Sequence, residues 1–582
     1  MRILLAPILL ATACAIGLPP RESPLGTARN DQGLTDAPSA PLADTAPSPS
    51  AEPVEAPLLS EPSDLLELLW SHRLNFAAGG SPLVTIRLME GQPEIAFRAR
   101  AAGRIRPRGG RDIPVLPGRT YRVRAHDALP AALTHRPLLA EVPFRDREAL
   151  DAAQKRWSER GISARQRIIG GVYGIAGRVV DNRRLLLLAD GDGSEAWADA
   201  LASQIQSLTG ERPPLFTDLL TRPTGRLEIL GPDDQPLGSA DAALGLEVDG
   251  DAGFALLRTE HDTGYASHGF EDRIYPGRLF VTIDSTGRLA AVHGIALEQL
   301  LRGLVPSEMP ASAPLEALKA QAVTARSNVL AQIGTRHLTD PYVLCSEVHC
   351  QAYKGETAQA ASTDLAVRAT SGEALFGRVD QTLVDAVYSA ICGGHGEDND
   401  AVWSGDLPSS HLRGQPDLPP DQGAVWSEGL QSEARLRAFL AAAPIAYCRR
   451  ATGAPKDRFR WERRLSAATV AAQTATLGVG AVSSIEVLKR GVSGRARSIR
   501  IRGDLQTAQV DGELRIRRLF GNLPSSMFLV ELERGEFVFR GGGWGHGAGM
   551  CQWGAIGRAQ AGQSYREILR AYYAGAEPAQ VY

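Results

Sequence analysis

The chain has 582 residues, of which 43% are hydrophobic and 22% charged, and its formal net charge is −3. This length allows two or three domains, and the two fractions are those of an ordinary globular protein. The charge is small and no polybasic run is present, although arginines cluster locally, as at residues 105–111 (IRPRGGR), so the composition argues against nucleic acid as a partner.

The N-terminus, MRILLAPILLATAC, has one arginine, a short apolar core and small residues before Cys14. This is the pattern of an export signal, and it is too short to span a membrane. ATAC is similar to a bacterial lipobox, in which Cys14 becomes the lipidated first residue, although Ala11 stands where leucine is usual. Ordinary cleavage after Ala13 is the alternative. We therefore expect residues 1–13 to be a signal peptide and the protein to be exported to the bacterial envelope, in the periplasm or on the outer face of a membrane.

Residues 14–62 are dense in proline, alanine, serine and acidic residues and lack apolar periodicity. This composition predicts a disordered tether. No later segment is apolar for long enough to form a transmembrane helix, so we expect contact with a membrane only through an N-terminal lipid.

Residues 63–140 alternate apolar with polar residues between glycine-rich turns, which predicts a β-rich segment. The pattern then changes to two helices, REALDAAQKRWSERG and SEAWADALASQIQSLTG, which end at Gly161 and Gly210 and enclose strands. This block, residues 141–212, resembles a SPOR domain, a small module that binds glycan strands stripped of peptide. An unrelated α+β insertion is the alternative.

A long helix is predicted within Val305–Gly334, where Ser312 can cap it, Pro314 sits in its first turn and Gly334 ends it. Arg326 falls on the apolar stripe of this helix. If Arg326 points inward, its guanidinium needs a hydrogen-bond acceptor, either a carboxylate or a substrate oxygen. The alternative is that its aliphatic part lies along the surface and the guanidinium stays in water.

Glu308 lies just before this helix in VPSEMP, between two prolines. The fixed φ angles of Pro306 and Pro310 would hold its carboxyl on a stiff connector, and the apolar neighbours would raise its pKa, as a proton donor requires. A solvated surface glutamate is the alternative.

Four blocks of the sequence resemble the SpoIID/LytB family of bacterial cell-wall proteins, in the family's order. They are PSEMPASAPLEALKAQAVTARS, YVLCSEVHCQAYKGE, YSAICGGHGEDNDAVW and GGGWGHGAGMCQWGAIGRAQAGQSYREILRAYYAGA. We assign residues 213–582 to this domain, with residues 63–140 as its β-rich N-terminal part. The expected fold class is α+β, a mixed β-rich and helical SpoIID-like domain with a small inserted SPOR-like module.

The resemblance implies a function on peptidoglycan. The family includes lytic transglycosylases of spore-forming bacteria, which cut glycan strands where stem peptides have been removed, and a modifier of a cell-wall amidase. Its catalytic glutamate matches Glu308, and one carboxyl can serve as acid and then as base. A hydrolase would need two carboxyls, for which Glu397, Asp398 and Asp400 are candidates. We therefore expect a lytic transglycosylase. The alternative is a non-catalytic glycan-binding protein that stimulates an amidase, and a zinc amidase is a third hypothesis.

The stretch GGGWGHGAGMCQWG, Gly541–Gly554, implies tight turns around His546. A turn in which His546 merely bonds to backbone is one interpretation; the resemblance implies instead that His546 lines a glycan cleft. Trp544 or Trp553 could then stack on sugars, although core packing is favoured for Trp553. The substrate-binding candidates are Arg326, Tyr388, Trp544, His546 and Gln552.

Two thiols and two imidazoles, from His337, Cys345, His349 and Cys350, have the number and type of ligands for tetrahedral zinc. A Cys345–Cys350 disulfide is the rival, and the resemblance favours metal because some family members carry metal here. With four protein ligands the zinc would be structural, about one per chain, and the glycosidic chemistry would need no cofactor. Cys392 and Cys448 then remain as a candidate disulfide, with Cys551 as a buried thiol.

Overall fold

The computed structural model describes residues 64–77, 80–175, 178–250, 252–263, 268–347, 349–403 and 408–582. The chain divides into two compact units, Met1–Leu58 and Leu59–Tyr582, and every described residue falls in the second. The predicted signal peptide, the lipidation at Cys14 and the tether lie outside the described residues. Among those described, no helix has the length and apolar character needed to cross a membrane.

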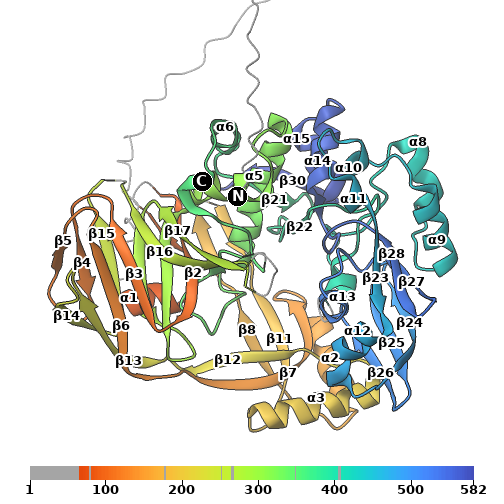
Figure 1. The fold of residues 1–582 in the computed structure, drawn as a ribbon, viewed down its shortest axis with the longest axis horizontal. Coiled ribbons are helices and arrows are strands. Elements are labelled where there is room, and N and C mark those ends of the chain that lie inside the picture. The colour runs from red at the N-terminus through yellow and green to blue at the C-terminus, as the bar shows by residue number, and fades with distance from the viewer. Residues whose placement is uncertain are drawn as a thin grey trace, which may run out of the picture. The chain divides into compact units, whose positions relative to one another are not determined.

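Two mostly antiparallel sheets form the first layer of the second unit (Figure 1). Their strands are β1 (Asn75–Phe76), β2 (Pro82–Gln92), β3 (Glu94–Ala99), β4 (Gly103–Pro107), β5 (Ile113–Val115), β6 (Thr120–Leu129), β13 (Thr224–Leu230), β14 (Pro236–Asp241), β15 (Ala243–Val248), β16 (Phe254–His261), β17 (Gly269–Tyr275), β18 (Arg278–Ile283), β19 (Leu289–Ala296) and β20 (Leu344–Cys345). One sheet has the order β1-β2-β19-β18-β15-β4-β5, with β20 pairing in parallel with β2, and the other β14-β13-β6-β3-β16-β17. The alternation of apolar and polar residues in the sequence explains which face of these strands is buried. In β3, for example, Ile95, Phe97 and Ala99 face the common core.

These sheets join segments that the sequence analysis had separated. Strand β2 pairs with β19, and β6 pairs with β13, in which Thr224 lies opposite Leu129. The predicted β-rich part, residues 63–140, therefore shares both sheets with residues after 213. Alternation reveals which face of a strand is buried but not which strand lies beside it.

A smaller sheet with two helices lies between these strands in the sequence. It comprises β7 (Ala132–Pro143), α2 (Arg147–Ser158), β8 (Ala164–Ile169), β11 (Arg184–Ala189), α3 (Glu195–Thr209) and β12 (Leu215–Thr221), with a hairpin of β9 (Val172–Ile175) and β10 (Arg178–Asp181) between β8 and β11. The sheet order β12-β7-β11-β8, with every neighbouring pair antiparallel, is the split βαβ arrangement of ferredoxin-like folds. We call residues 132–221 the inserted module.

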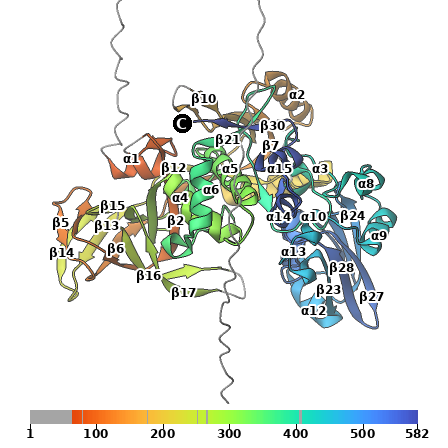
Figure 2. The same ribbon diagram turned by 90° about the horizontal axis from the view of Figure 1, so that it is seen from above.

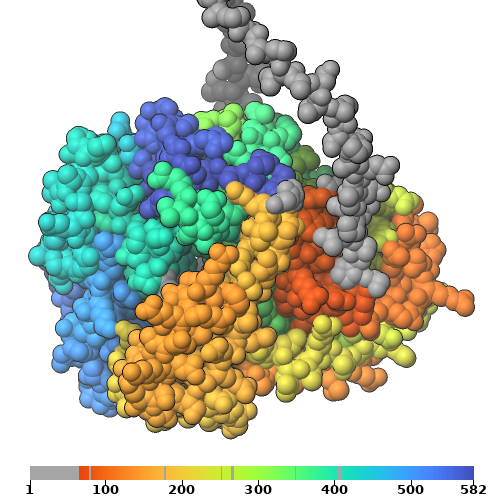
Figure 3. All heavy atoms as spheres, turned by 180° about the vertical axis from the view of Figure 1, so that it is seen from behind, coloured from red at the N-terminus to blue at the C-terminus, as the bar shows by residue number. Residues whose placement is uncertain are grey.

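The two helices predicted for the inserted module are confirmed, and Gly210 caps α3 in the left-handed conformation, with φ 78°. The module is wider than the predicted range 141–212, because its outer strands begin and end beyond that range. An ion pair of 2.7 Å between Glu211 and Lys489 joins it to the C-terminal part, and the two surfaces adjoin in Figure 3. A SPOR-type role in glycan binding stays a prediction.

Helices α4 (Leu297–Glu308), α5 (Leu315–Gln332) and α6 (Ala361–Ala369) form the next layer. Two local expectations were wrong. Pro314, not Ser312, occupies the N-cap position of α5. Helix α4 continues through Pro306 and ends at Glu308, so this glutamate lies on a helical turn rather than on a connector. Proline has a helical φ angle, and although it removes one N–H bond and crowds the carbonyl four residues before it, this can kink a helix without ending it.

Arg326 of α5 is fully buried, with 0% of its surface exposed. Its guanidinium donates to both carboxylate oxygens of Glu298 on α4, at 2.7 and 2.8 Å, and to the carbonyl of Glu373 at 2.9 Å. The sequence had left open whether Arg326 binds a carboxylate or a substrate oxygen, and the structure shows that it binds a carboxylate. The prediction that Arg326 binds substrate is therefore wrong, because its donors are used inside the core.

The C-terminal part contains a second β structure, which we call the C-terminal β module. Its elements are β23 (Arg460–Ser466), α12 (Ala467–Gln473), β24 (Val482–Arg490), β25 (Ala496–Gly503), β26 (Thr507–Asp511), α13 (Glu513–Leu519), β27 (Phe528–Glu533) and β28 (Glu536–Gly542). Its two three-stranded sheets, β23-β28-β27 and β24-β25-β26, enclose a core of their own that includes Ile499, Phe528 and Phe539.

After this module the chain returns to the helical layer (Figure 2). It does so through β29 (Met550–Cys551), α14 (Gln552–Gln560), α15 (Tyr565–Tyr572) and β30 (Ala576–Gln580). Both α14 and α15 contact α5, and β30 pairs with β21 (Glu373–Gly377). The mixture of antiparallel sheets and segregated helices confirms the predicted α+β class.

Replacing Arg326 by methionine tests the buried ion pair. The substitution leaves the carboxylate of Glu298 without its main partner, and we expect a loss of about 3–5 kcal/mol in the free energy of unfolding. The matched control is Arg437→Met, which removes exposed pairs with Glu433 and Glu531 and should cost at most about 1 kcal/mol. Urea unfolding of both variants measures the difference, and equal midpoints would contradict the assignment.

Candidate functional site

Segments from four parts of the chain converge on Glu308. Besides the C-terminal end of α4, which carries Glu308, they are the middle of α5 at Gln321, the loop at Gln351 and Ala352, strand β22 (Tyr388–Ser389) and the start of α14. Strand β22 pairs in parallel with β29, and Tyr388 lies opposite Met550. This pairing places Gln552, the first residue of α14, beside the carboxyl of Glu308.

Two amide donors hold the half-buried carboxyl of Glu308. The backbone N–H of Ala352 donates to Oε1, and the Gln552 side chain donates to Oε2 at 3.3 Å and to the Glu308 carbonyl at 3.0 Å. Burial raises the pKa of Glu308 above its usual range, and the bonds from Ala352 and Gln552 oppose that rise. The carboxyl is thus oriented and inclined to hold a proton, as a general acid requires.

Tyr388 and Gln552, two of the substrate-binding candidates, therefore lie at the predicted acid. The Tyr388 hydroxyl donates to Gln351 Oε1 at 2.9 Å, and burial raises the pKa of this phenol well above its usual range. The Gln552 amide also lies 3.4 Å from Gln321 Oε1. Gln321 and Gln351 were not predicted, although both lie in blocks of the sequence that carry the family resemblance.

His546 uses both ring nitrogens on backbone. Nε2 lies 2.9 Å from the Tyr388 carbonyl, to which it donates, and Nδ1 accepts the N–H of Ala548 at 3.1 Å. Burial, with the charges of Arg495 and Arg517, lowers the pKa of His546 to about 3, so the ring is neutral. His546 positions Tyr388 and has no nitrogen left for a sugar, which corrects its assignment as a substrate-binding residue.

The glycines around His546 serve close packing inside the protein. A Cβ at Gly549 would lie 1.9 Å from the Val387 carbonyl oxygen, and one at Gly547 would lie 2.4 Å from Arg495 Cζ. Both glycines have positive φ angles, 67° and 84°. At these two positions the bare backbone makes room for protein rather than for a glycan.

The tryptophans of this stretch contact protein as well. Trp553 packs against two hydrophobic clusters, as favoured from the sequence. Trp544 is half-buried, with the guanidinium of Arg458 4.2 Å from its ring centroid, and its stacking on a sugar stays a prediction. Trp403, which was not predicted from the sequence, is half-buried with its ring 5.0 Å from that of His546.

The three carboxyls considered for a hydrolase are engaged elsewhere. Glu397 is 1% exposed and accepts the Ser493 hydroxyl at 2.6 Å. Asp398 and Asp400 pair with Arg413 at 3.3 and 2.6 Å. These contacts support the structure of the loop, and none involves Glu308.

The predicted zinc ligands come together. His337 Nε2 lies 3.1 Å from Cys350 Sγ, and His349 Nδ1 lies 3.7 Å from the sulfurs of both Cys345 and Cys350. Zn–S bonds of about 2.3 Å and Zn–N bonds of about 2.0 Å at the tetrahedral angle place sulfur and nitrogen about 3.5 Å apart, so the set fits zinc. Both thiols are free, and the alternative of a Cys345–Cys350 disulfide is therefore wrong.

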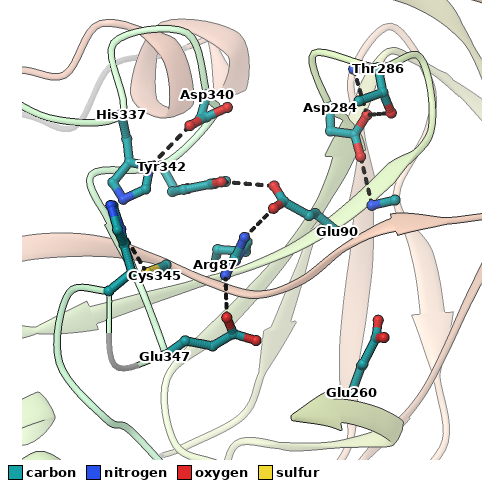
Figure 4. A network of polar contacts seen from close by, with 12 residues as sticks. Arg87, Glu90, Glu260, Asp284, Thr286, His337, Asp340, Tyr342, Cys345 and Glu347 are labelled. Carbon is teal, nitrogen blue, oxygen red and sulfur yellow. Dashed lines mark hydrogen bonds and ion pairs between the residues drawn. The ribbon is translucent and has the colours of Figure 1, made fainter. Parts of the chain in front are cut away.

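Polar contacts orient this His/Cys cluster (Figure 4). His337 Nδ1 lies 3.0 Å from Asp340 Oδ2, which leaves Nε2 facing the thiols, an arrangement common behind metal-binding histidines. The loop is also attached to β2, through Arg87 to Glu347 at 3.4 Å and through the Tyr342 hydroxyl to Glu90 at 2.8 Å.

The predicted Cys392–Cys448 disulfide is wrong. The two sulfurs lie 3.7 Å apart and both are free thiols. Cys551 is buried, as expected, but it lies in the same cluster, because its sulfur and a carboxylate oxygen of Asp417 are within 4.8 Å of the other two.

A cavity of about 560 Å³ lies elsewhere, where the segment after α1 (Leu65–Trp70) faces the inserted module. Its lining includes His72, Ile169, Tyr173 and Gly334, and Glu308 is not part of it. No sequence motif had pointed to it.

Comparisons with known proteins match two segments. Residues 285–376 match the family model described as SpoIID, Stage II sporulation protein, and residues 397–549 match a domain of unknown function, DUF8618. An uncharacterized protein of Brachyspira hyodysenteriae is 29% identical over 322 residues, which cover 55% of this chain and 75% of that protein. The amidase enhancer of Bacillus subtilis is 27% identical over 291 residues, 47% of this chain and 39% of the enhancer.

Among solved structures, a putative exported protein from Burkholderia pseudomallei aligns with 30% of this chain and 27% of its own, at 16% identity and a TM-score of 0.16, which carries no inference about fold. The SpoIID match contains Glu308, Arg326 and the whole His/Cys cluster. The resemblance seen in the sequence is therefore confirmed: residues 285–376 match the SpoIID family model, and 47% of the chain is similar to the Bacillus subtilis amidase enhancer.

Proposed function

We propose that this protein acts on the bacterial cell wall and cleaves the glycan strands of peptidoglycan as a lytic transglycosylase. The SpoIID match and the relative named amidase enhancer support a role at the cell wall. The observation that carries the enzymatic proposal is the half-buried carboxyl of Glu308, held between two amide donors with its pKa raised by burial. The export signal predicted at residues 1–13, with or without a lipid on Cys14, would deliver the protein to its substrate.

Glu308 acts first as an acid and then as a base in this mechanism. The protonated carboxyl gives its proton to the glycosidic oxygen, and the bond to the anomeric carbon of N-acetylmuramic acid breaks. The 6-hydroxyl of the same sugar attacks that carbon, and the carboxylate accepts the hydroxyl proton. The product is a 1,6-anhydro sugar, and no water is consumed.

The neighbours of Glu308 favour this route over hydrolysis. Its polar partners among the described residues are the Ala352 N–H, the Gln552 amide and the Tyr388 phenol, none of which is a second carboxylate. A hydrolase requires a second carboxyl as nucleophile or as base for water. Gln552 and Tyr388 lie there instead and use their donors on Glu308, Gln321 and Gln351, so their contact with a sugar stays a prediction.

The second candidate function is a non-catalytic protein that binds glycan strands and stimulates a cell-wall amidase. The observation in its favour is the name of the Bacillus subtilis relative. Such a protein would use the same surface without needing proton transfer from Glu308.

The isosteric variant Glu308→Gln tests the enzymatic proposal. Full-length protein should release 1,6-anhydro products from peptide-free glycan strands, and we expect Glu308→Gln to lower that rate by about 10²–10⁴-fold, the contribution of a general acid. The matched control is Glu486→Gln, on the exposed face of β24, which should keep the wild-type rate. Absence of anhydro products from the wild type, or equal rates for Glu308→Gln, would overturn the assignment; amidase stimulation that survives Glu308→Gln would support the second candidate.

The pH dependence of the rate gives a further prediction. The acid must be protonated, so activity is present below the raised pKa of Glu308 and is lost as pH rises through it. Gln552 donates to the carboxylate, so Gln552→Met removes stabilisation of the charged form and should move the alkaline limb upward by about one pH unit, or ~1.4 kcal/mol. Rate profiles of the two proteins measure this shift, and an unmoved or lowered limb would refute the role given to Gln552.

We also propose that His337, Cys345, His349 and Cys350 hold one structural zinc ion. Four protein ligands leave no position for a catalytic water, so the metal would close the loop after α5.

Cys350→Ser should lower the zinc content by about one ion per chain and lower the melting temperature. Acid should release the metal, because the thiols must be ionised and the imidazoles neutral. Unchanged zinc content by elemental analysis would refute the site.

A further inference from the structure

A second cluster of metal-ligand side chains lies inside the C-terminal part of the chain. It consists of Cys392, Cys448, Cys551 and Asp417, which are 1–3% exposed. One ligand atom from each residue lies within 4.8 Å of the other three. The Cys392 sulfur lies 3.7 Å from that of Cys448 and 3.5 Å from Asp417 Oδ2. We call these four residues the Cys₃Asp cluster.

These separations match a tetrahedral metal site. Two sulfurs bonded to zinc at about 2.3 Å lie about 3.8 Å apart, and a sulfur and a carboxylate oxygen lie about 3.5 Å apart. A disulfide would bring two sulfurs to about 2.05 Å. The distances around Cys392 are thus those of ligands that share an ion, and they exceed the length of a bond between the sulfurs.

Backbone groups around the sulfurs are arranged as donors to thiolates. The N–H of Cys392 lies 3.1 Å from the Cys551 sulfur, the N–H of Gly554 lies 3.3 Å from the same sulfur, and the N–H of Gly394 lies 3.4 Å from the Cys392 sulfur. Cys551 is also the N-cap of α14, where the helix dipole favours negative charge. Each of these contacts stabilises an ionised sulfur, the form that binds metal.

The carboxylate of Asp417 is held by an outer layer of contacts. Tyr572 donates to Oδ2 at 3.0 Å, and the guanidinium of Arg558 donates to Oδ1 at 2.9 and 3.1 Å. Three thiolates and one carboxylate around a divalent ion leave an excess of negative charge, which Arg558 and the backbone donors offset. Outer partners of this kind orient the ligands of metal sites.

We propose that the Cys₃Asp cluster binds a second structural zinc ion. With four protein ligands it has no open position. Cys392 and Cys551 flank the segment 397–549, whereas Asp417 and Cys448 lie inside it. The ion therefore joins both ends of that segment to its interior. It also fixes the start of α14, where Gln552 reaches Glu308. The Cys₃Asp site does not depend on the glycan chemistry proposed for Glu308, and the expected count of two ions includes the zinc proposed for the His/Cys cluster.

The test is the zinc content of the full chain, purified without chelator and compared with two single variants and one double variant. We expect about two ions per chain in the wild type and about one each in Cys350→Ser and Cys448→Ser. The double variant should have none. Cys350→Ser is the matched control, because it removes a thiol from the His/Cys cluster alone. Zinc content unchanged by Cys448→Ser, or Cys392 and Cys448 resistant to alkylation until reduced, would overturn the proposal.

A measurement on Cys350→Ser alone decides the case if Cys448→Ser does not fold. This variant retains the whole Cys₃Asp cluster, so it should bind about one cobalt ion in exchange for zinc and show the visible bands of tetrahedral cobalt with thiolate charge transfer. Absence of these bands and of zinc from folded Cys350→Ser would overturn the second site. Neither outcome bears on Glu308, whose glycan assay is separate.

Discussion

The ion pair between Arg326 and Glu298 is the constraint on which the arrangement of the site depends. Helix α5 is buried along nearly its whole length, so its one arginine needs a carboxylate in the core. That carboxylate comes from the first turn of α4, and the last residue of the same helix is Glu308. Because the pair fixes α4 against α5 at one end, it also fixes where the acid lies at the other.

The surroundings of Glu308 have neutral polar groups where many glycosidases have a second acid. An amide N–H, a glutamine and a phenol can hold both the protonated and the ionised carboxyl, at a modest cost for either form. This balance suits a residue that must give a proton and take one back within a single turnover. His546 contributes indirectly, because its neutral ring holds the backbone of Tyr388 in place.

The sequence predicted local features well and distant partnerships poorly. The inward position of Arg326 followed from helical periodicity, and the His337, Cys345, His349 and Cys350 set followed from short spacing. Glu308 was found through the family resemblance, because its flanking prolines alone did not distinguish it from a solvated surface glutamate, and its partners Ala352 and Gln552 come from segments 44 and 244 residues away. Cys392, Cys448 and Cys551 have no motif spacing, and a disulfide was the default expectation until their geometry was known. Strand alternation likewise did not show that β6 pairs with β13 across the inserted module.

The place of the inserted module in the sheet has a consequence for how such chains diversify. It leaves the host sheet after β6 and returns at β13, where Leu129 and Thr224 face each other as direct neighbours. A short turn between those two residues would preserve the register of both sheets, since the ends of the insertion already meet. The module is nevertheless tied to the rest of the fold, because Ile175 and Val180 are buried in the main core and Asn182 donates to the carbonyls of Ala331 and Ile333 at the end of α5. Any module that replaced it would have to fill the same part of the core and bond the same carbonyls, so the insertion is constrained by the end of α5 as well as by the host sheet.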